Sequence, residues 1–260
     1  MLNIIYEDKD VIVIDKPAGI AVHPKDRYDK SKTIVLLLYR HFPEIKNVGD
    51  PSNASEHGIL RPGIVHRLDK ETSGLMVIAK NNDAFFELKK QFQERKVEKK
   101  YIALVSGVLE KKSGTIEIPL VKAGPKTQTR YTIHPPAIRQ QLRSAGGQLW
   151  RAGNIRYTKA AKPALTQYRV LKHCKDYTLV EVTPKTGRQH QIRVHFASIN
   201  HPVACDKLYG RKAKKCPSGL ERHFLHASYL KFRLKNALME FESALPEDLK
   251  KALSSINING

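Results

Sequence analysis

Short runs of apolar residues dominate the hydrophobic pattern of the chain, and they predict more strands than helices. The run at 74–79 contains no charged position and predicts a buried strand. Two runs near the end, at 225–232 and 238–241, predict a hairpin. The other predicted strands lie at 4–6, 11–15, 101–105, 115–119, 127–133, 165–171 and 177–183.

Apolar residues spaced three and four apart predict the helices. Phe85, Leu88 and Phe92 have this spacing, as do Ile192, Phe196 and Ile199. The predicted helices cover residues 33–40, 84–95 and 189–199, and a last one begins at Pro246. Because the strands cluster in the middle and at the end, we expect an α+β fold with a mixed, largely antiparallel β-sheet and flanking helices. We expect one catalytic domain over residues 1–260 and a surface loop at 46–61.

Positive charge is concentrated in one part of the chain. Lys and Arg number 46 against 25 Asp and Glu, so the net charge is +21. Residues 118–175 contain no acidic residue but twelve basic ones. The middle of this stretch, about 135–161, has no clear periodicity and reads as a basic insertion between strands. This distribution predicts a nucleic acid as partner.

The cysteines and the N-terminal residues indicate the cellular compartment of the protein. Cys174, Cys205 and Cys216 are odd in number and lack metal-site spacing, which favours reduced thiols in a cytosolic protein. The N-terminal residues lack the apolar stretch of a signal peptide. No apolar run approaches the roughly 20 residues that span a bilayer. We therefore expect a cytoplasmic protein that does not enter a membrane.

The segment from His66 to Gly74 is the first candidate site, because it places Asp69 in a polar loop between apolar strands. Such a carboxylate can act as a nucleophile or base, or merely cap the amides of Thr72 or Ser73. A kinase loop would read H-R-D, but Leu68 intervenes. A serine hydrolase motif would need a glycine that is missing here.

The second candidate segment covers residues 186–195. Arg188 falls at the predicted helix start, where free amides attract anions. Arg193 follows the buried-face residue Ile192 and could point into a cleft, although a solvated basic helix fits the same pattern. His190 and His195 are five residues apart without an intervening Glu, so hydrogen-bonded or solvated histidines fit better than zinc ligands.

Several segments, taken in chain order, resemble the motifs of the RluA-type pseudouridine synthases. His66-Arg67-Leu68-Asp69 with the following Thr72-Ser73-Gly74-Leu75 is similar to the family signature. The remaining matches are Asp15–Gly19, Val22–Pro24, Lys100–Val105, Thr186–His195, His201-Pro202, Asp206, Tyr209-Gly210 and Leu225–Ala227. Most of the chain is covered, and the resemblance implies an enzyme that isomerises uridines of ribosomal or transfer RNA.

The resemblance implies three catalytic residues. Asp69 would be the catalytic aspartate, and Arg193 would pair with its carboxylate. Tyr101 would pack on the target base and assist proton removal late in the reaction. Because uracil is detached from C1′, turned and rejoined through C5, the reaction requires no redox cofactor, nucleotide or metal.

The resemblance also implies substrate contacts. Arg67 would enter the RNA and help to extrude the base, since a base inside a helix cannot be reached. Ile192 would line the pocket. The other substrate-binding residues that we expect are His66, Arg188 and Lys16.

Some features depart from the family pattern. The first motif begins near residue 11, which leaves no room for the S4-like RNA-binding domain of some members. Cys205 stands where the pattern has Gly, and the 135–161 insertion matches no motif, so we expect it to dock RNA. The alternatives are a catalytically silent RNA-binding or ribosome-assembly protein on this fold and, more remotely, a metal-dependent nuclease. Nothing in the sequence suggests an oligomer, so we expect a monomer.

Overall fold

The computed structural model describes residues 2–24, 28–29, 31–49, 62–123, 130–133, 151–152, 155–156, 161–210 and 216–257. The chain divides into two compact units. The first contains residues 1–102 and 218–255, and the second contains 103–217 and 256–260. Strand β4 (Glu98–Ser106) begins in the first unit and ends in the second. The expected single catalytic domain stays a prediction.

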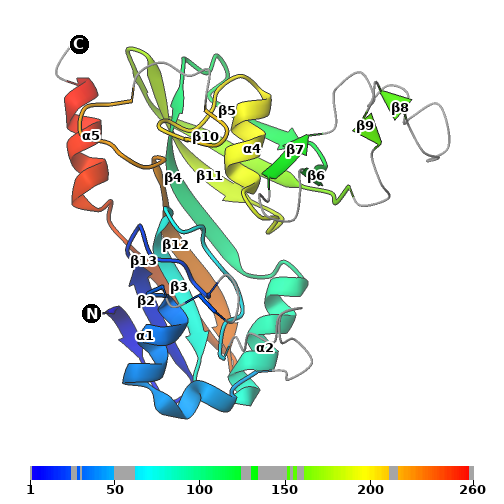
Figure 1. The fold of residues 1–260 in the computed structure, drawn as a ribbon, viewed down its shortest axis with the longest axis vertical. Coiled ribbons are helices and arrows are strands. Elements are labelled where there is room, and N and C mark those ends of the chain that lie inside the picture. The colour runs from blue at the N-terminus through cyan, green and yellow to red at the C-terminus, as the bar shows by residue number, and fades with distance from the viewer. Residues whose placement is uncertain are drawn as a thin grey trace. The chain divides into compact units, whose positions relative to one another are not determined.

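The sheet of the first unit has the strand order β1–β2–β3–β12, with β13 also paired to β12. Its strands are β1 (Asn3–Glu7), β2 (Val11–Lys16), β3 (Ser73–Ala79), β12 (Leu225–Leu234) and β13 (Ala237–Glu242). The β1–β2, β2–β3 and β12–β13 pairs are antiparallel, whereas β3 and β12 run parallel. This arrangement confirms the predicted mixed, largely antiparallel sheet and its C-terminal hairpin (Figure 1).

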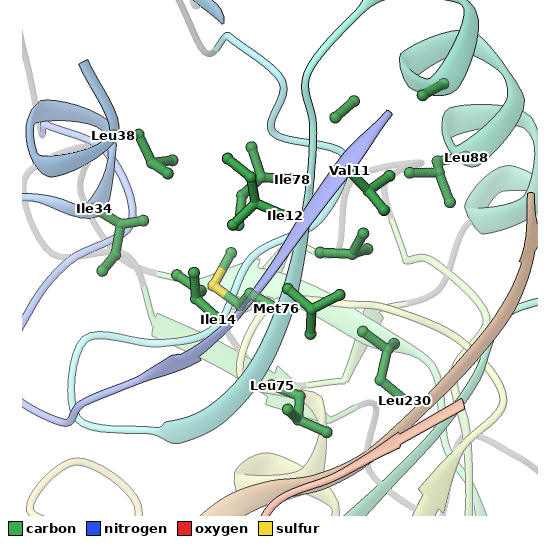
Figure 2. Close-up of a cluster of buried hydrophobic side chains, with 14 of the residues drawn as sticks. Val11, Ile12, Ile14, Ile34, Leu38, Leu75, Met76, Ile78, Leu88 and Leu230 are labelled. Carbon is green, nitrogen blue, oxygen red and sulfur yellow. The ribbon is translucent and has the colours of Figure 1, made fainter. Parts of the chain in front are cut away.

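Helices cover both faces of β2 and β3. Ile34 and Leu38 of α1 (Ile34–His41) face the side chains of Ile12 and Ile14, whereas Leu88 of α2 (Asn82–Gln93) lies on the other side (Figure 2). Every residue of β3 is therefore buried, as predicted for this run. The turn η1 (Pro43–Asn47) follows α1, and α5 (Glu247–Asn257) closes the unit.

The second unit contains the end of β4, then the strand order β11–β10–β5. Its other elements are β5 (Ser113–Glu117), β6 (Leu120–Ala123), β7 (Arg130–Ile133), β8 (Arg151–Ala152), β9 (Ile155–Arg156), β10 (Leu165–Cys174), β11 (Tyr177–Pro184) and α4 (Gln191–Ser198). Strand β10 runs three residues beyond its predicted end, and its pairing with β11 shifts register between Val170 and Lys172. The shift is a β-bulge or irregularity that lets the ladder continue.

Several sequence predictions need correction or lie outside the described residues. η1, β6 and the two-residue pair β8–β9 were not expected from the pattern, because elements this short carry no measurable periodicity. Of the predicted basic insertion at 135–161, only 151–152, 155–156 and 161 are described. Most of the predicted loop at 46–61 also lies outside the described residues. Among the helices that are described, none has the length and apolar character needed to cross a membrane.

The expectation of three reduced thiols is wrong for two of the cysteines. Cys205 and Cys216 form a disulfide that spans 11 residues, with Cα atoms 5.2 Å apart. Their sequence spacing matches no recognised motif, so the pairing could not be predicted from a local pattern. Cys174 is buried and takes no part in this disulfide.

Candidate active site

The Asp69 loop, residues 66–72, connects a segment that pairs with the end of β3 to the first residue of that strand. Ile64 forms an antiparallel bridge with Ile78 near the end of β3, and the chain then passes Asp69 and enters β3 at Ser73. The Thr72 amide donates to the Asp69 carbonyl oxygen at 3.1 Å, which closes a tight turn.

His66 holds the loop against β3. Its Nε2 atom accepts a hydrogen bond from the Val77 amide at 3.1 Å, and its ring stacks on Phe92 at 4.6 Å between centroids. Burial and the nearby Lys99 charge lower the pKa of His66 to about 3, so the ring is neutral. In this position the ring supports the loop, and the substrate contact expected of His66 stays a prediction. Arg67, the next residue, is exposed.

Lys16, at the end of β2, is fully buried beside the Asp69 loop. Its Nζ atom donates to the carbonyl oxygens of Pro17, Ile20 and Lys70 at 2.8–3.1 Å. The Gly19 amide also donates to the Lys70 carbonyl. Burial lowers the pKa of Lys16 to about 8. All three ammonium protons are thus directed at the backbone, which supports positioning of the loop rather than the predicted contact with RNA.

Tyr101 in β4 shares an electrostatic environment with Asp69. The Tyr101 side chain is half-buried against the core of the first unit. Burial and the Asp69 negative charge both raise the pKa of the Tyr101 phenol. The phenol is therefore protonated at neutral pH, and Asp69 is the carboxylate whose charge acts on it.

A buried polar network below the Asp69 loop was missed by the sequence analysis. Arg222 donates from Nη1 to the Glu71 carbonyl at 3.0 Å and from Nη2 to Ser73 Oγ at 3.2 Å. Thr72 Oγ1 lies 2.8 Å from His223 Nε2. The only sequence signal was the position of Arg222 and His223 just before the Leu225–Ala227 motif.

The Ser73–His226 pair has the appearance of a nucleophile and base but is structural. Ser73 Oγ lies 3.0 Å from His226 Nδ1, and His226 Nε2 faces the Ser243 carbonyl. Because a carbonyl only accepts, Nε2 carries the proton and Nδ1 accepts from the serine. Both side chains are buried out of reach of a substrate, which agrees with the rejection of a serine hydrolase.

The second unit holds Ile192 and Arg193 on α4, where both are buried. The Arg193 Nε and Nη2 atoms donate to the two carboxylate oxygens of Asp206 at 2.7 and 2.9 Å. The Tyr209 ring lies against the guanidinium at 5.2 Å. The interpretation of this segment as a solvated basic helix is therefore wrong.

Asp206 is held by its own turn. Its Oδ1 atom accepts from the amides of Leu208 and Tyr209 at 2.9 and 3.0 Å. Burial raises the pKa of Asp206, but the hydrogen bonds and charge of Arg193 outweigh it and leave the pKa below its ordinary value. Cys205 has a φ of 59°, in the left-handed region that glycine adopts most readily. The family pattern has glycine at this position for that conformation.

Gln191 fixes the start of α4. Its Oε1 atom accepts from Thr186 Oγ1 at 2.6 Å and from the Arg188 amide at 3.0 Å. Its Nε2 atom donates to the Leu165 carbonyl and to Thr166 Oγ1. Buried His195 continues this network to Thr166 Oγ1 and the Ile118 carbonyl, so it is hydrogen-bonded as expected. The sequence analysis had not identified Gln191 as functional.

Arg188 does not lie at the helix start, contrary to the prediction. His190 adopts a φ of 55°, so α4 begins only at Gln191. Arg188 lies in the preceding turn, half-buried, with Nε donating to the Pro163 carbonyl at 3.2 Å. The structure therefore brings Lys16, His66, Asp69 and Tyr101 together in the first unit and Arg188, Ile192 and Arg193 in the second.

Known structures share this fold. The human protein RNA Pseudouridylate Synthase Domain Containing 4 matches with a TM-score of 0.70 and 27% identity, over 98% of this chain and 92% of that one. Human RNA Pseudouridylate Synthase Domain Containing 1 matches with a TM-score of 0.66 and 26% identity, over 95% and 84% of the two chains.

A family model described as RNA pseudouridylate synthase matches residues 10–198, so the chain belongs to this family of isomerases. An uncharacterized RNA pseudouridine synthase of Aquifex aeolicus is 42% identical over 97% of this chain and 72% of its own length. The ribosomal large subunit pseudouridine synthase D of Haemophilus influenzae is 34% identical over 98% of this chain and 71% of its own. These matches confirm the family expected from the sequence.

Proposed function

We propose that this protein converts specific uridines of ribosomal RNA to pseudouridine and that Asp69 is its catalytic aspartate. The observation that carries this proposal is the family match over residues 10–198, which includes the Asp69 loop and Tyr101. Relatives named for the ribosomal large subunit favour ribosomal over transfer RNA. The predicted monomeric state and cytoplasmic location stay predictions.

The target uridine is taken out of the RNA structure before reaction. Arg67 is exposed on the loop between His66 and Asp69, which suits a side chain that enters the space left by the base. Removing a base from its stack costs a few kcal/mol, and contacts of a chain with a charge of +21 to the phosphate backbone offset this cost.

The isomerisation breaks the C1′–N1 bond, forms a C1′–C5 bond and has the net effect of moving a proton from C5 to N1. Tyr101 is a protonated phenol at neutral pH, so it does not act as a phenolate base. It assists C5 deprotonation by passing its own proton to the Asp69 carboxylate as it receives the new one. The pairing of Arg193 with the Asp69 carboxylate, which would keep that carboxylate ionised, stays a prediction from the family resemblance.

Chemical mapping of pseudouridine tests this function. Total ribosomal and transfer RNA would be compared from a host that lacks the native gene and carries wild type, Asp69→Asn or Asp83→Asn. Asp83 is an exposed residue in the first turn of α2 and serves as the matched control. We expect one or more ribosomal sites with wild type and Asp83→Asn, and none with Asp69→Asn.

Two outcomes would contradict the proposal. Sites that persist with Asp69→Asn would show that this residue is not the catalytic group. Sites found only in transfer RNA would show that the substrate class is wrong. If wild type forms no pseudouridine yet binds RNA, the alternative of a silent RNA-binding or ribosome-assembly protein gains support.

A further inference from the structure

Lys99 has no carboxylate partner among the residues that the structure describes, and it lies beside the ring that stacks on His66. Lys99 is in β4, two residues before Tyr101, so both side chains project from the same face of the strand. Its Nζ atom lies 5.5 Å from the centre of the Phe92 ring, the ring that stacks on His66. Lys99 therefore lies beside the Phe92–His66 stack, at the residue where the Asp69 loop begins.

The charge of Lys99 is balanced differently from that of nearby lysines. Lys80 and Lys235, in the same unit, each reach a carboxylate oxygen at 2.7 Å. Within the described part of the chain, no ion pair or hydrogen bond engages Lys99 Nζ, although its side chain is half-buried. Burial accordingly lowers the pKa of Lys99. His66 adds no compensating charge, because its ring is neutral.

Holding a half-buried ammonium without a counter-ion costs free energy, and the cost is recovered when an anion binds. The Phe92 ring supports the cation from one side through its π face. The partner expected on the other side is an anion brought by the substrate. In RNA, that anion is a backbone phosphate.

We propose that Lys99 binds a backbone phosphate of the RNA strand whose uridine enters the Asp69 site. The proposal rests on the proposed function and adds to it one contact that neither the motifs nor the predicted substrate-binding residues include. Arg67 is exposed on the Asp69 loop, one residue after His66 and two residues before Asp69. Lys99 would hold the strand while Arg67 enters it.

Salt-dependent binding tests the contact. Dissociation constants for a ribosomal RNA fragment would be measured from low to moderate salt in an Asp69→Asn background, so that no turnover interferes. Lys99→Met keeps the apolar stem and removes one charge. Its matched control is Lys100→Met, because Lys100 is the next residue of β4, points to the other face, and lies over the Tyr229 ring near Glu98.

We expect Lys99→Met to bind several-fold more weakly and to lower the slope of log K against log salt by about 1. Lys100→Met should leave the slope at its original value, and Lys99→Arg should restore it. An unchanged slope in Lys99→Met would overturn the proposal. So would an equal loss in Lys99→Met and Lys99→Arg, because that pattern indicates a packing role.

A second measurement does not depend on the folding of any variant. In the wild-type protein, bound RNA should protect Lys99 from an amine-modifying reagent more than it protects Lys100. Equal modification with and without RNA would overturn the contact. Failure of the proposed function would be recognised separately. In that case mapping finds no pseudouridine in the RNA, whereas the salt dependence of RNA binding can still be measured.

Discussion

Arg222 joins the Asp69 loop to the last helix of the chain: its guanidinium pairs with Asp248 of α5 at 2.6 Å and also bonds Glu71 and Ser73. Partial burial raises the pKa of Asp248, but Arg222 outweighs this and leaves the pKa lowered. The loop is therefore supported from below by residues far away in sequence.

Replacing Arg222 by Met should lower the free energy of unfolding by about 3 kcal/mol, because Ser73 and the Glu71 carbonyl lose a buried donor. Asp248→Asn should cost less than about 1 kcal/mol, since Asp248 is 44% exposed. Urea unfolding measures both changes. Equal costs for the two variants would contradict this assignment of Arg222 as the central residue of the network.

Asp206→Asn should cost about 3–5 kcal/mol of stability and most of the activity, because it leaves Arg193 without its buried counter-ion. A lowered folded-state pKa means that this stabilisation is present above about pH 4 and is lost as the pH falls through the folded value. Acid unfolding of wild type and variant measures the difference. Glu181→Gln, which removes the exposed Arg169 pair, is the control and should change stability by less than about 1 kcal/mol.

Lys16→Met should lower kcat at least tenfold, on the order expected for a displaced catalytic group, and leave the RNA dissociation constant within about twofold. The reason is that Nζ bonds three carbonyls of the loop frame. Single-turnover kinetics and binding separate the two quantities. A large loss of affinity with unchanged kcat would instead support the direct substrate contact predicted from the sequence.

The pKa of Lys16 also predicts how the stability of the protein changes at alkaline pH. Lys16 has a pKa of about 8 in the folded protein, against about 10.4 in an unfolded chain. The unfolded state thus binds more protons between these values, so this group's contribution to stability rises with pH and is lost as pH falls through 8. Between pH 8 and 10, the free energy of unfolding of wild type should therefore rise relative to that of Lys16→Met.

Tyr101→Phe should reduce turnover by about 10²- to 10⁴-fold, the range for a lost proton-transfer group, and leave RNA binding intact. Because the pKa of Tyr101 is raised, the wild-type rate should show no fall near pH 10 from ionisation of this phenol. Tyr229→Phe is the control, since its hydroxyl donates to Glu240. A Tyr101→Phe variant with wild-type turnover would remove Tyr101 from the mechanism.

Gly74→Ala should prevent stable folding or cost more than about 3 kcal/mol. Gly74 has a φ of 117°, and an added Cβ would overlap the Ala227 backbone in the parallel β3–β12 pair. Gly19→Ala, at φ 83° with open space around it, should cost only about 1 kcal/mol. Thermal unfolding compares the two, and similar melting temperatures would contradict the close approach.

The sequence predicted the residues on the loop better than it predicted their supports. Asp69 and its flanking strands follow from a polar segment between apolar runs. Arg222 and Asp248 do not, because their partners are tertiary and about 150 residues separate Arg222 from the loop. Hydrophobic periodicity reports local secondary structure and does not predict which distant residues form a pair.

Local backbone geometry was the second limit. The pattern placed Arg188 in a helix, but the left-handed conformation of His190 delays the helix to Gln191. Likewise the substrate contacts predicted for Lys16 and His66 stay predictions, whereas the burial of Lys16 and the bonds of both side chains to backbone atoms are properties of packing. A sequence motif predicts which positions belong to a site, whereas the contacts of each side chain are known only from the folded structure.

The parallel pairing of β3 with β12 has a consequence for synthesis on the ribosome. The nascent chain carries Asp69 early, but Ser73 meets its strand partner His226 only after the C-terminal part of the chain has emerged. Arg222 emerges just before His226, and its partner helix α5 emerges after both. The Asp69 loop therefore acquires its strand partner and its support from α5 only late in translation, although its own sequence is translated much earlier.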